Sequence, residues 1–237
     1  GAGASTAQPA VSGLLTAAWS LPGRWSGVAT DEKTGVIRAL GDDRFAEIDV
    51  QGRIRHGSRF PWNSEARLLR PAKSPRLAFV TFTPWGIRRG VVGHGVRGES
   101  LWYYVVPDAP DDVWVSDVDG DKIDEVIIGY NGRGGLHVLD DQGRLGWTAS
   151  LANVWMVAAG DVLGLGTSQV VTTSARGRIH IFNGTDGTGR PDIAPPPHLT
   201  RVVRVRKIHA GDEAATIFAA GSNRGVSTAM AFSGSGD

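Results

Sequence analysis

The chain has 237 residues, of which 41% are hydrophobic, and this length and composition suit one large all-β domain with a proper core. Its 25 basic and 24 acidic residues nearly balance, which argues against a net field directed at nucleic acid or a membrane surface. The absence of cysteine excludes disulfides, thiol catalysis and thiolate metal sites, and no apolar run approaches the ~20 residues that span a bilayer.

The first residues of the chain, 1–13, are mostly small and low in complexity. They predict a flexible N-terminal segment, typical of a mature chain after removal of a signal peptide or of a cloning remnant. The segment itself lacks the basic region and the longer apolar block of a signal peptide. Location outside the cytoplasm, extracellular or periplasmic, is therefore an expectation for this chain.

Beyond this segment the sequence repeats. Short runs of Val, Ile, Thr and aromatic residues alternate with turns rich in Gly and Pro, which predicts many short strands and no long helix. An Arg at the start of a strand recurs about every 45 residues, and each follows a second apolar strand. The five anchors of this repeat are Arg44, Arg89, Arg133, Arg176 and Arg224. A stacked β-solenoid is one architecture with such a period, but several strands per repeat favour a blade.

The fold predicted for residues 14–237 is therefore a single β-propeller domain of five blades with four strands each. Residues 14–25 have the same form as residues 145–155, which join one repeat to the next. They have no preceding strands of their own, whereas the last repeat has three strands. We expect the N-terminal strand, residues 14–21, to complete the fifth blade and close the ring, which would also cover an exposed sheet edge.

An acidic loop lies in the third repeat, directly before an apolar strand. Its alternate positions are occupied by Asp117, Asp119, Asp121, Ile123 and Glu125. Alternate carboxylates on a tight loop can converge on one hard cation, with the backbone carbonyl of the position held by Ile123 as a further ligand, and calcium takes six to eight oxygens at such sites. A solvated acidic turn is the alternative interpretation.

This spacing, running directly into a strand, resembles the calcium loop of FG-GAP and related propeller repeats, a group that includes VCBS-like repeats. The resemblance is good in the third repeat and weak elsewhere, because the fourth repeat keeps only Asp161 and the fifth keeps only Asp212 and Glu213. It implies a β-propeller with one calcium ion. We expect that ion to be structural, because five acidic groups leave little room for an open coordination position.

Two of the eight tryptophans, Trp62 and Trp85, lie outside the repeat register, in predicted loops near Arg88 and Arg89. A large aromatic side chain in a loop is less often needed for packing than one in a strand, and aromatic and Arg side chains are enriched at binding interfaces. These four residues are therefore the candidate partner-binding residues. The alternative is that each tryptophan folds back and caps the edge of a blade. The remaining tryptophans repeat in first and fourth strands, which favours packing between adjacent blades.

Together these features predict a non-catalytic, secreted or periplasmic propeller that acts as a protein-binding module or accessory subunit of an assembly. No set of catalytic residues and no cofactor motif accompanies the repeats, so we expect neither enzymatic activity nor nucleic-acid binding. The alternative is a glycan-binding lectin or a polysaccharide lyase-like propeller, because calcium-loop propellers resemble both groups and loop tryptophans can stack on sugar rings. The fold alone does not choose between these functions.

Overall fold

In a computed structural model of the chain, the described residues are 19–31, 33–61, 64–69, 76–83, 90–105, 108–194, 202–206, 213–223 and 226–232. They contain eighteen strands and no helix, and the strands form five separate antiparallel sheets. The all-β prediction is therefore confirmed. The described residues also hold no helix that could cross a membrane.

The first three sheets have four strands each, in chain order from one edge to the other. Sheet 1 comprises β1 (Trp25–Thr30), β2 (Ile37–Gly41), β3 (Arg44–Ile48) and β4 (Ile54–Arg59). Sheet 2 comprises β5 (Glu65–Leu68), β6 (Phe79–Phe82), β7 (Gly90–His94) and β8 (Ser100–Val105). Sheet 3 comprises β9 (Pro110–Ser116), β10 (Glu125–Tyr130), β11 (Leu136–Leu139) and β12 (Leu145–Ala149).

The last two sheets have three strands each within the described residues. Sheet 4 comprises β13 (Val154–Gly160), β14 (Gln169–Ser174) and β15 (Ile179–Asn183), and sheet 5 comprises β16 (Val202–Arg206), β17 (Thr216–Asn223) and β18 (Val226–Phe232). Sheet 4 has no regular fourth strand in the described residues, so the prediction of four strands per blade is not confirmed there. There, Gly189 and Ile193 make only isolated bridges to β15, and the intervening Pro191 has no N–H to donate to a ladder.

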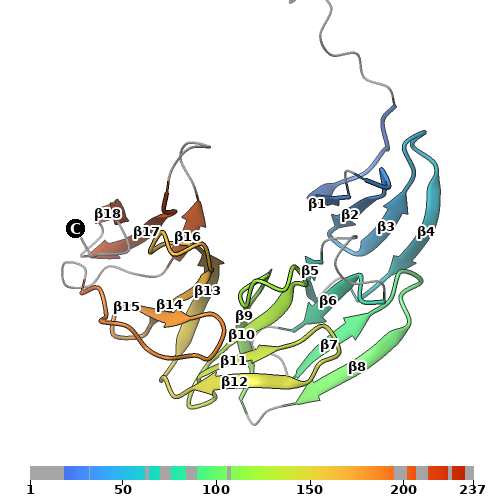
Figure 1. The fold of residues 1–237 in the computed structure, drawn as a ribbon. Coiled ribbons are helices and arrows are strands. Elements are labelled where there is room, and N and C mark those ends of the chain that lie inside the picture. Colours follow the sequence, from blue (N-terminus) through green and yellow to red (C-terminus); the bar gives the residue numbers. More distant parts are fainter. Residues whose placement is uncertain are drawn as a thin grey trace, which may run out of the picture.

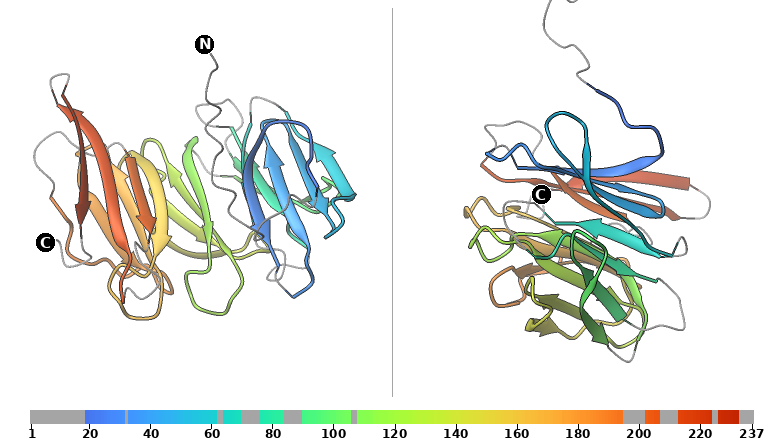
Figure 2. Two further views of the ribbon diagram at one scale, coloured as in Figure 1. Left: turned by 90° about the horizontal axis from the view of Figure 1, so that it is seen from above. Right: turned by 90° about the vertical axis from the view of Figure 1, so that its right-hand side faces the viewer.

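The five sheets follow one another around an arc, with sheet 1 at one end and sheet 5 at the other (Figures 1 and 2). Each pair of successive sheets encloses an apolar core. Val80 and Val126, for example, share the core between sheets 2 and 3, and Ile127 and Val157 share the next one. Adjacent residues of β10 thus point into different cores, which explains why this middle strand is apolar throughout and fully buried.

A tryptophan contact recurs between the outer strand of one sheet and the last turn of the next. Trp102 on β8 donates its indole N–H to Asp141 O at 3.1 Å, and Trp147 on β12 donates to Gly184 O at 2.7 Å. Each ring packs on a glycine of that turn: a Cβ at Gly143, where φ is +77°, would lie 2.6 Å from Trp102. We call this contact the tryptophan clamp, and it confirms the expected packing between adjacent blades.

Trp19 makes the same clamp without a preceding sheet in the described residues. Its indole donates to Val50 O at 3.1 Å, and its ring lies against Gly52 in the turn before β4. Trp19 and Leu21 also pack on the outward face of sheet 1. The predicted closing strand, residues 14–21, is described only from Trp19 onward, and the proposed flexible segment 1–13 lies outside the described residues. Five blades in a closed ring therefore stay a prediction.

Candidate functional site

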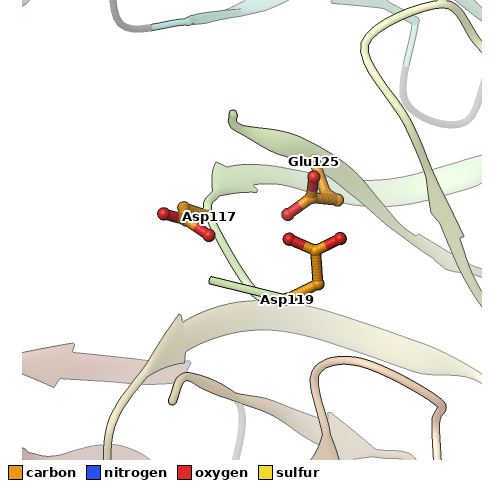
Figure 3. Close-up of side chains that lie close together, drawn as sticks. All are labelled: Asp117, Asp119 and Glu125. Atoms are coloured by element: carbon orange, nitrogen blue, oxygen red, sulfur yellow. The ribbon is translucent and has the colours of Figure 1, made fainter. Parts of the chain in front are cut away.

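The predicted cation site lies in the loop between β9 and β10. Here Asp117, Asp119 and Glu125 each contribute a carboxylate oxygen to a group whose members lie within 4.8 Å of one another. Figure 3 shows the carboxylates of Asp119 and Glu125 facing each other, with Asp117 beside them. The structure therefore brings together three of the four predicted side-chain ligands, and Asp121 does not belong to this group. Coordination by the backbone carbonyl of Ile123 stays a prediction.

The loop is shaped by its own side chains. Asp117 Oδ1 accepts a hydrogen bond from Gly120 N at 2.8 Å, and Asp119 Oδ1 accepts one from Asp121 N at 3.0 Å. Asp121 Oδ1 accepts the N–H of Ile123 at 2.6 Å, so all three of these aspartates bond to the loop's own backbone. Gly120 has a φ of +88° with open space around it, which supplies the left-handed turn that the spacing requires.

Glu125 is the buried member of the group. Its Oε2 accepts the N–H of Val118 at 2.8 Å, which ties the start of β10 to the acidic loop. Burial, together with the negative charges of Asp119, Asp121 and Asp117, raises the pKa of Glu125 to about 8. A carboxyl group that resists ionisation for these reasons is one that a cation would stabilise in its charged form.

Sheet 4 shows the same loop position without the charge. Gln169 begins β14 as Glu125 begins β10, and its Oε1 accepts the N–H groups of Val162 and Leu163 at 2.9 and 3.0 Å. Asp161, the one acid kept in this loop, accepts hydrogen bonds from the backbone N–H groups of Leu165 and Gly166. A neutral amide thus performs the structural task of Glu125 without offering a carboxylate to an ion.

The four predicted partner-binding residues, Trp62, Trp85, Arg88 and Arg89, all lie outside the described residues. The residues that flank their segments are described, and they lie together. Pro61, Ser64, Thr83 and Gly90 line one cavity of about 480 Å³ against sheet 2. The two loops therefore start from the same end of this sheet, as the pairing of Glu65 with Phe82 requires.

The outer strand of sheet 2 carries an exposed apolar stripe. Leu101, Tyr103 and Val105 alternate along one face of β8 and are 39%, 56% and 58% exposed. Sequence reasoning missed this stripe because a run that alternates between buried and exposed apolar residues resembles any well-packed strand. The other face of β8 carries Trp102 and Tyr104, which pack on the core between sheets 2 and 3.

A Ser–His–Asp network in sheet 4 was also missed. Ser174 Oγ lies 3.0 Å from His180 Nε2, and His180 Nδ1 lies 2.8 Å from Asp192 Oδ1. Although a catalytic triad has this connectivity, Ser174 is only 5% exposed, and in sheet 2 Thr81 and His94 form the same cross-strand pair. The network holds the segment after β15 onto the sheet, which is a structural role.

The innermost strands of sheets 2, 3 and 4 carry another hydrogen-bond network. Arg67 on β5 donates to Val113 O at 2.8 Å and to Asp112 Oδ1 at 3.0 Å, and Asp112 Oδ2 accepts the N–H of Val157 at 3.1 Å. These bonds join sheets 2, 3 and 4 near their inner edges. The neighbouring carboxylate of Asp111 is enclosed and makes no hydrogen bond, and burial with the nearby charge of Asp112 raises its pKa to about 6.

Comparison with known proteins identifies the fold. The model of the lambda-carrageenase beta-propeller domain matches residues 90–190, which run from β7 past the end of β15. No curated protein matches the sequence of the chain. The match to this family model and the similarity to propeller structures show that the chain has a β-propeller fold, whereas membership of the FG-GAP or VCBS family is not confirmed.

Three solved structures show the extent of this similarity. BBS1N, in a crystal structure with ARL6DN, has a TM-score of 0.53 and 12% identity, with 84% of this chain and 60% of that chain covered. The Dos1 propeller has a TM-score of 0.54 and 13% identity, with 83% of this chain and 53% of that chain covered. The computationally designed Ika8 protein has a TM-score of 0.53 and 13% identity, with 86% of this chain and 57% of that chain covered. The chain thus spans little more than half the length of the structures that it resembles.

Proposed function

We propose that this chain is a non-catalytic binding module, a β-propeller scaffold that docks a protein partner on sheet 2. The observation that carries the proposal is the exposed stripe of Leu101, Tyr103 and Val105 on β8. Apolar residues exposed singly are normal on a protein surface, but a contiguous apolar patch is typical of an interaction site. This outer strand also has an open edge, which a propeller ordinarily protects with polar or charged residues.

The corresponding outer strands support this assignment by contrast. On β4 the exposed apolar residue Ile54 is followed by Arg55, and Arg59 ends the strand, whereas on β12 the exposed residue Leu145 is followed by glycine. Neither strand carries three alternating exposed apolar side chains. Because the predicted loops with Trp62 and Trp85 start beside the same sheet, a partner on β8 could reach them as well.

The test is capture of partners from the native source by tagged protein, with a double variant Leu101→Ser and Val105→Ser. We expect the variant to keep its melting temperature within about 2 °C, because both side chains are exposed, and to lose its captured partner. Leu145→Ser is the matched control, since Leu145 is 49% exposed on another outer strand. Equal capture by the wild type and the double variant would contradict the proposal.

We also propose that the acidic loop holds one structural calcium ion. The convergence of Asp117, Asp119 and Glu125 supports this, as does the raised pKa of Glu125. Asp121 accepts the N–H of Ile123 through Oδ1, and its second carboxylate oxygen, with the Ile123 carbonyl, would complete the shell once the loop closes around the ion. An ion here would hold the β9–β10 loop to the start of β10, at the end of the sheet opposite the loops beside sheet 2.

We propose as well that residues 14–21 close the propeller ring. Trp19 makes the contact that the outer-strand residues Trp102 and Trp147 make with the following sheet. By this equivalence, the segment that ends at Trp19 is the outer strand of the blade that precedes sheet 1 in the ring. Sheets 4 and 5 each have three strands in the described residues. Sheet 5, at the other end of the arc from sheet 1, is the blade that this segment would complete.

A second candidate function is carbohydrate binding, as a lectin or as the propeller of a polysaccharide-degrading enzyme outside the cell or in the periplasm. The match to the lambda-carrageenase propeller domain favours it. A glycan array that includes sulfated galactans such as λ-carrageenan tests this candidate directly. Retention of a sulfated galactan, with no effect of the Leu101 and Val105 changes, would favour it over protein docking.

A further inference from the structure

The cavity against sheet 2 has the size of a small-ligand site. Its volume is about 480 Å³, and three neighbouring strands contribute to it: Thr81 and Phe82 from β6, Val92 and His94 from β7, and Tyr103 from β8. Pockets that enclose a small molecule commonly have volumes of roughly 300–1,000 Å³ and combine aromatic walls with a few placed polar groups.

The aromatic wall is Tyr103. Its ring lies against the backbone of Gly90, where a Cβ would be 2.8 Å from a ring atom. Any larger residue at Gly90 would therefore displace the ring. More than half of Tyr103 remains exposed, so the ring presents an open apolar surface that the fold does not use. Since tyrosine has only two side-chain torsions, a ring seated in this way loses little freedom when a ligand packs on it.

The polar groups of the cavity are uncharged. Ser64, Thr81, Thr83 and Ser100 bring hydroxyl groups to its lining. His94 Nδ1 lies 3.3 Å from Gly98 O, a carbonyl that can only accept, so Nδ1 carries the proton and Nε2 accepts from Thr81 Oγ1 at 2.8 Å. Burial lowers the pKa of His94, which keeps the ring neutral at pH 7. The described lining thus contains no charged side chain.

The cavity is a property of this sheet and not of the repeat. His137 in sheet 3 stands six residues before the turn glycine Gly143, as Val92 stands six before Gly98 in sheet 2. His137 fills its site and bonds to the hydroxyl of Tyr104 at 2.8 Å. The smaller Val92 makes no such bond and lines open space instead.

We propose that this cavity binds a single uncharged sugar ring. The C–H face of the ring would pack on Tyr103, and its hydroxyl groups would exchange hydrogen bonds with the serine and threonine hydroxyls. Such hydroxyls both donate and accept, as sugar hydroxyls do, whereas a carboxylate or sulfate would lack a positive partner in the described lining. This inference rests on the second candidate function and specifies which sugar chemistry the site accepts.

The experiment is saturation-transfer NMR with titration, using methyl β-D-galactopyranoside, methyl α-D-glucopyranoside and methyl α-D-mannopyranoside, with D-glucuronic acid and galactose 6-sulfate as charged comparators. We expect at least one neutral glycoside to bind, and each charged sugar to bind at least about tenfold more weakly. Tyr103→Ala should weaken binding by about tenfold or more, and Tyr103→Phe should keep affinity within about threefold, because the ring face remains. Leu145→Ser is the control, because Leu145 is an exposed apolar residue of another outer strand, away from the cavity.

The inference is overturned if no neutral glycoside binds, if Tyr103→Ala binds as the wild type does, or if a charged sugar binds as tightly as the neutral ones. Binding of a sulfated galactan on the array without binding of any neutral glycoside would overturn the pocket and leave the second candidate function standing. If neither a glycan on the array nor a neutral glycoside in solution binds, both the second candidate function and the proposed sugar site are refuted. Because Tyr103 is largely exposed, equal melting temperatures of the variants establish that lost binding is not lost folding.

Discussion

Replacing Glu125 with Gln separates the structural task of this residue from its task as a metal ligand. In sheet 4 an amide already occupies the same position and bonds the same kind of backbone N–H groups. The substitution Glu125→Gln should therefore keep the bond from Val118 N and fold normally. It should also remove a carboxyl group whose ionisation burial and three neighbouring acids oppose.

The sign of the pH effect follows from the raised pKa. In the folded protein without metal, Glu125 holds its proton up to about pH 8, whereas the unfolded chain releases it near the ordinary value of 4.5. The wild type should thus lose stability as pH rises from 4.5 through 8, and Glu125→Gln should not show this loss. Above pH 8 and in chelator, the variant should be at least as stable as the wild type.

In excess calcium the wild type should become more stable than Glu125→Gln. At a free concentration of 100 times Kd, a bound ion stabilises by about 2.7 kcal/mol, which corresponds to roughly 5–11 °C in Tm for a chain of this size. Binding must displace the proton of Glu125, so the apparent affinity should fall by up to about tenfold for each pH unit below 8. Glu125→Gln should lose most of the calcium-dependent shift at every pH.

The assay is thermal unfolding in chelator and in excess calcium at pH 6, 7 and 8, with metal content measured on the purified protein. Asp161→Asn is the matched control, because it alters an acid in the corresponding loop of sheet 4. A calcium shift of equal size in the wild type and Glu125→Gln would refute the assignment of Glu125 as a ligand. A shift that does not change between pH 6 and 8 would refute the linkage to its proton.

Four further changes test other parts of the structure. Trp147→Ala should destabilise by about 2–4 kcal/mol through lost packing and the lost hydrogen bond, as measured by denaturant unfolding. Trp147→Phe should cost about 1–2 kcal/mol, because it loses the hydrogen bond and only part of the ring contact. Deleting residues 1–22 should lower solubility or cooperativity of unfolding, and a truncated chain that melts like the full chain would place ring closure elsewhere. Asp111→Asn should raise Tm at pH 7.5 by a few degrees, and the gain should vanish below about pH 4, because the wild-type carboxyl is neutral there in both states. Asp192→Ala should lower the free energy of unfolding by about 1–2 kcal/mol, because it removes the bond to His180. If the wild type hydrolyses a test ester and Asp192→Ala loses that activity while keeping its stability, the network is catalytic.

The repeat predicted most of the fold because each blade reuses the same physical solution. A middle strand buried on both faces must be continuously apolar, as β10 and β14 are, and such runs are conspicuous in the sequence. The turns need glycine at positive φ, as at Gly143 and Gly187, and these glycines recur at about the spacing of the anchor arginines. The irregularity of the fourth segment of sheet 4 was not predicted, since the His180–Asp192 bond that holds this edge leaves no signal in the sequence.

The candidate cation site was predicted only in part. Spacing identified which carboxylates share one loop, and Asp117, Asp119 and Glu125 do converge. Spacing did not reveal that Asp121 bonds to the backbone within its own turn, because such local bonds depend on loop conformation. The cavity of sheet 2 was beyond sequence reasoning for a different reason. One difference at this place is Val92 in sheet 2 against the larger His137 in sheet 3, and such a difference matters only once the two positions are known to be equivalent.

The tryptophan clamps have a consequence for the connectivity of the chain. Where sheet 3 passes into sheet 4, the backbone joins them through residues 150–153. Contacts that do not depend on this connection also join them, among them the bond from the Trp147 indole to Gly184 O. The covalent link is therefore partly redundant. A protease cut in this exposed connection should leave two fragments that stay associated and can be reassembled from separately produced halves. By the same logic, whole blades could be cut at such junctions and exchanged between related chains as interchangeable units, provided that each outer-strand tryptophan meets a turn glycine.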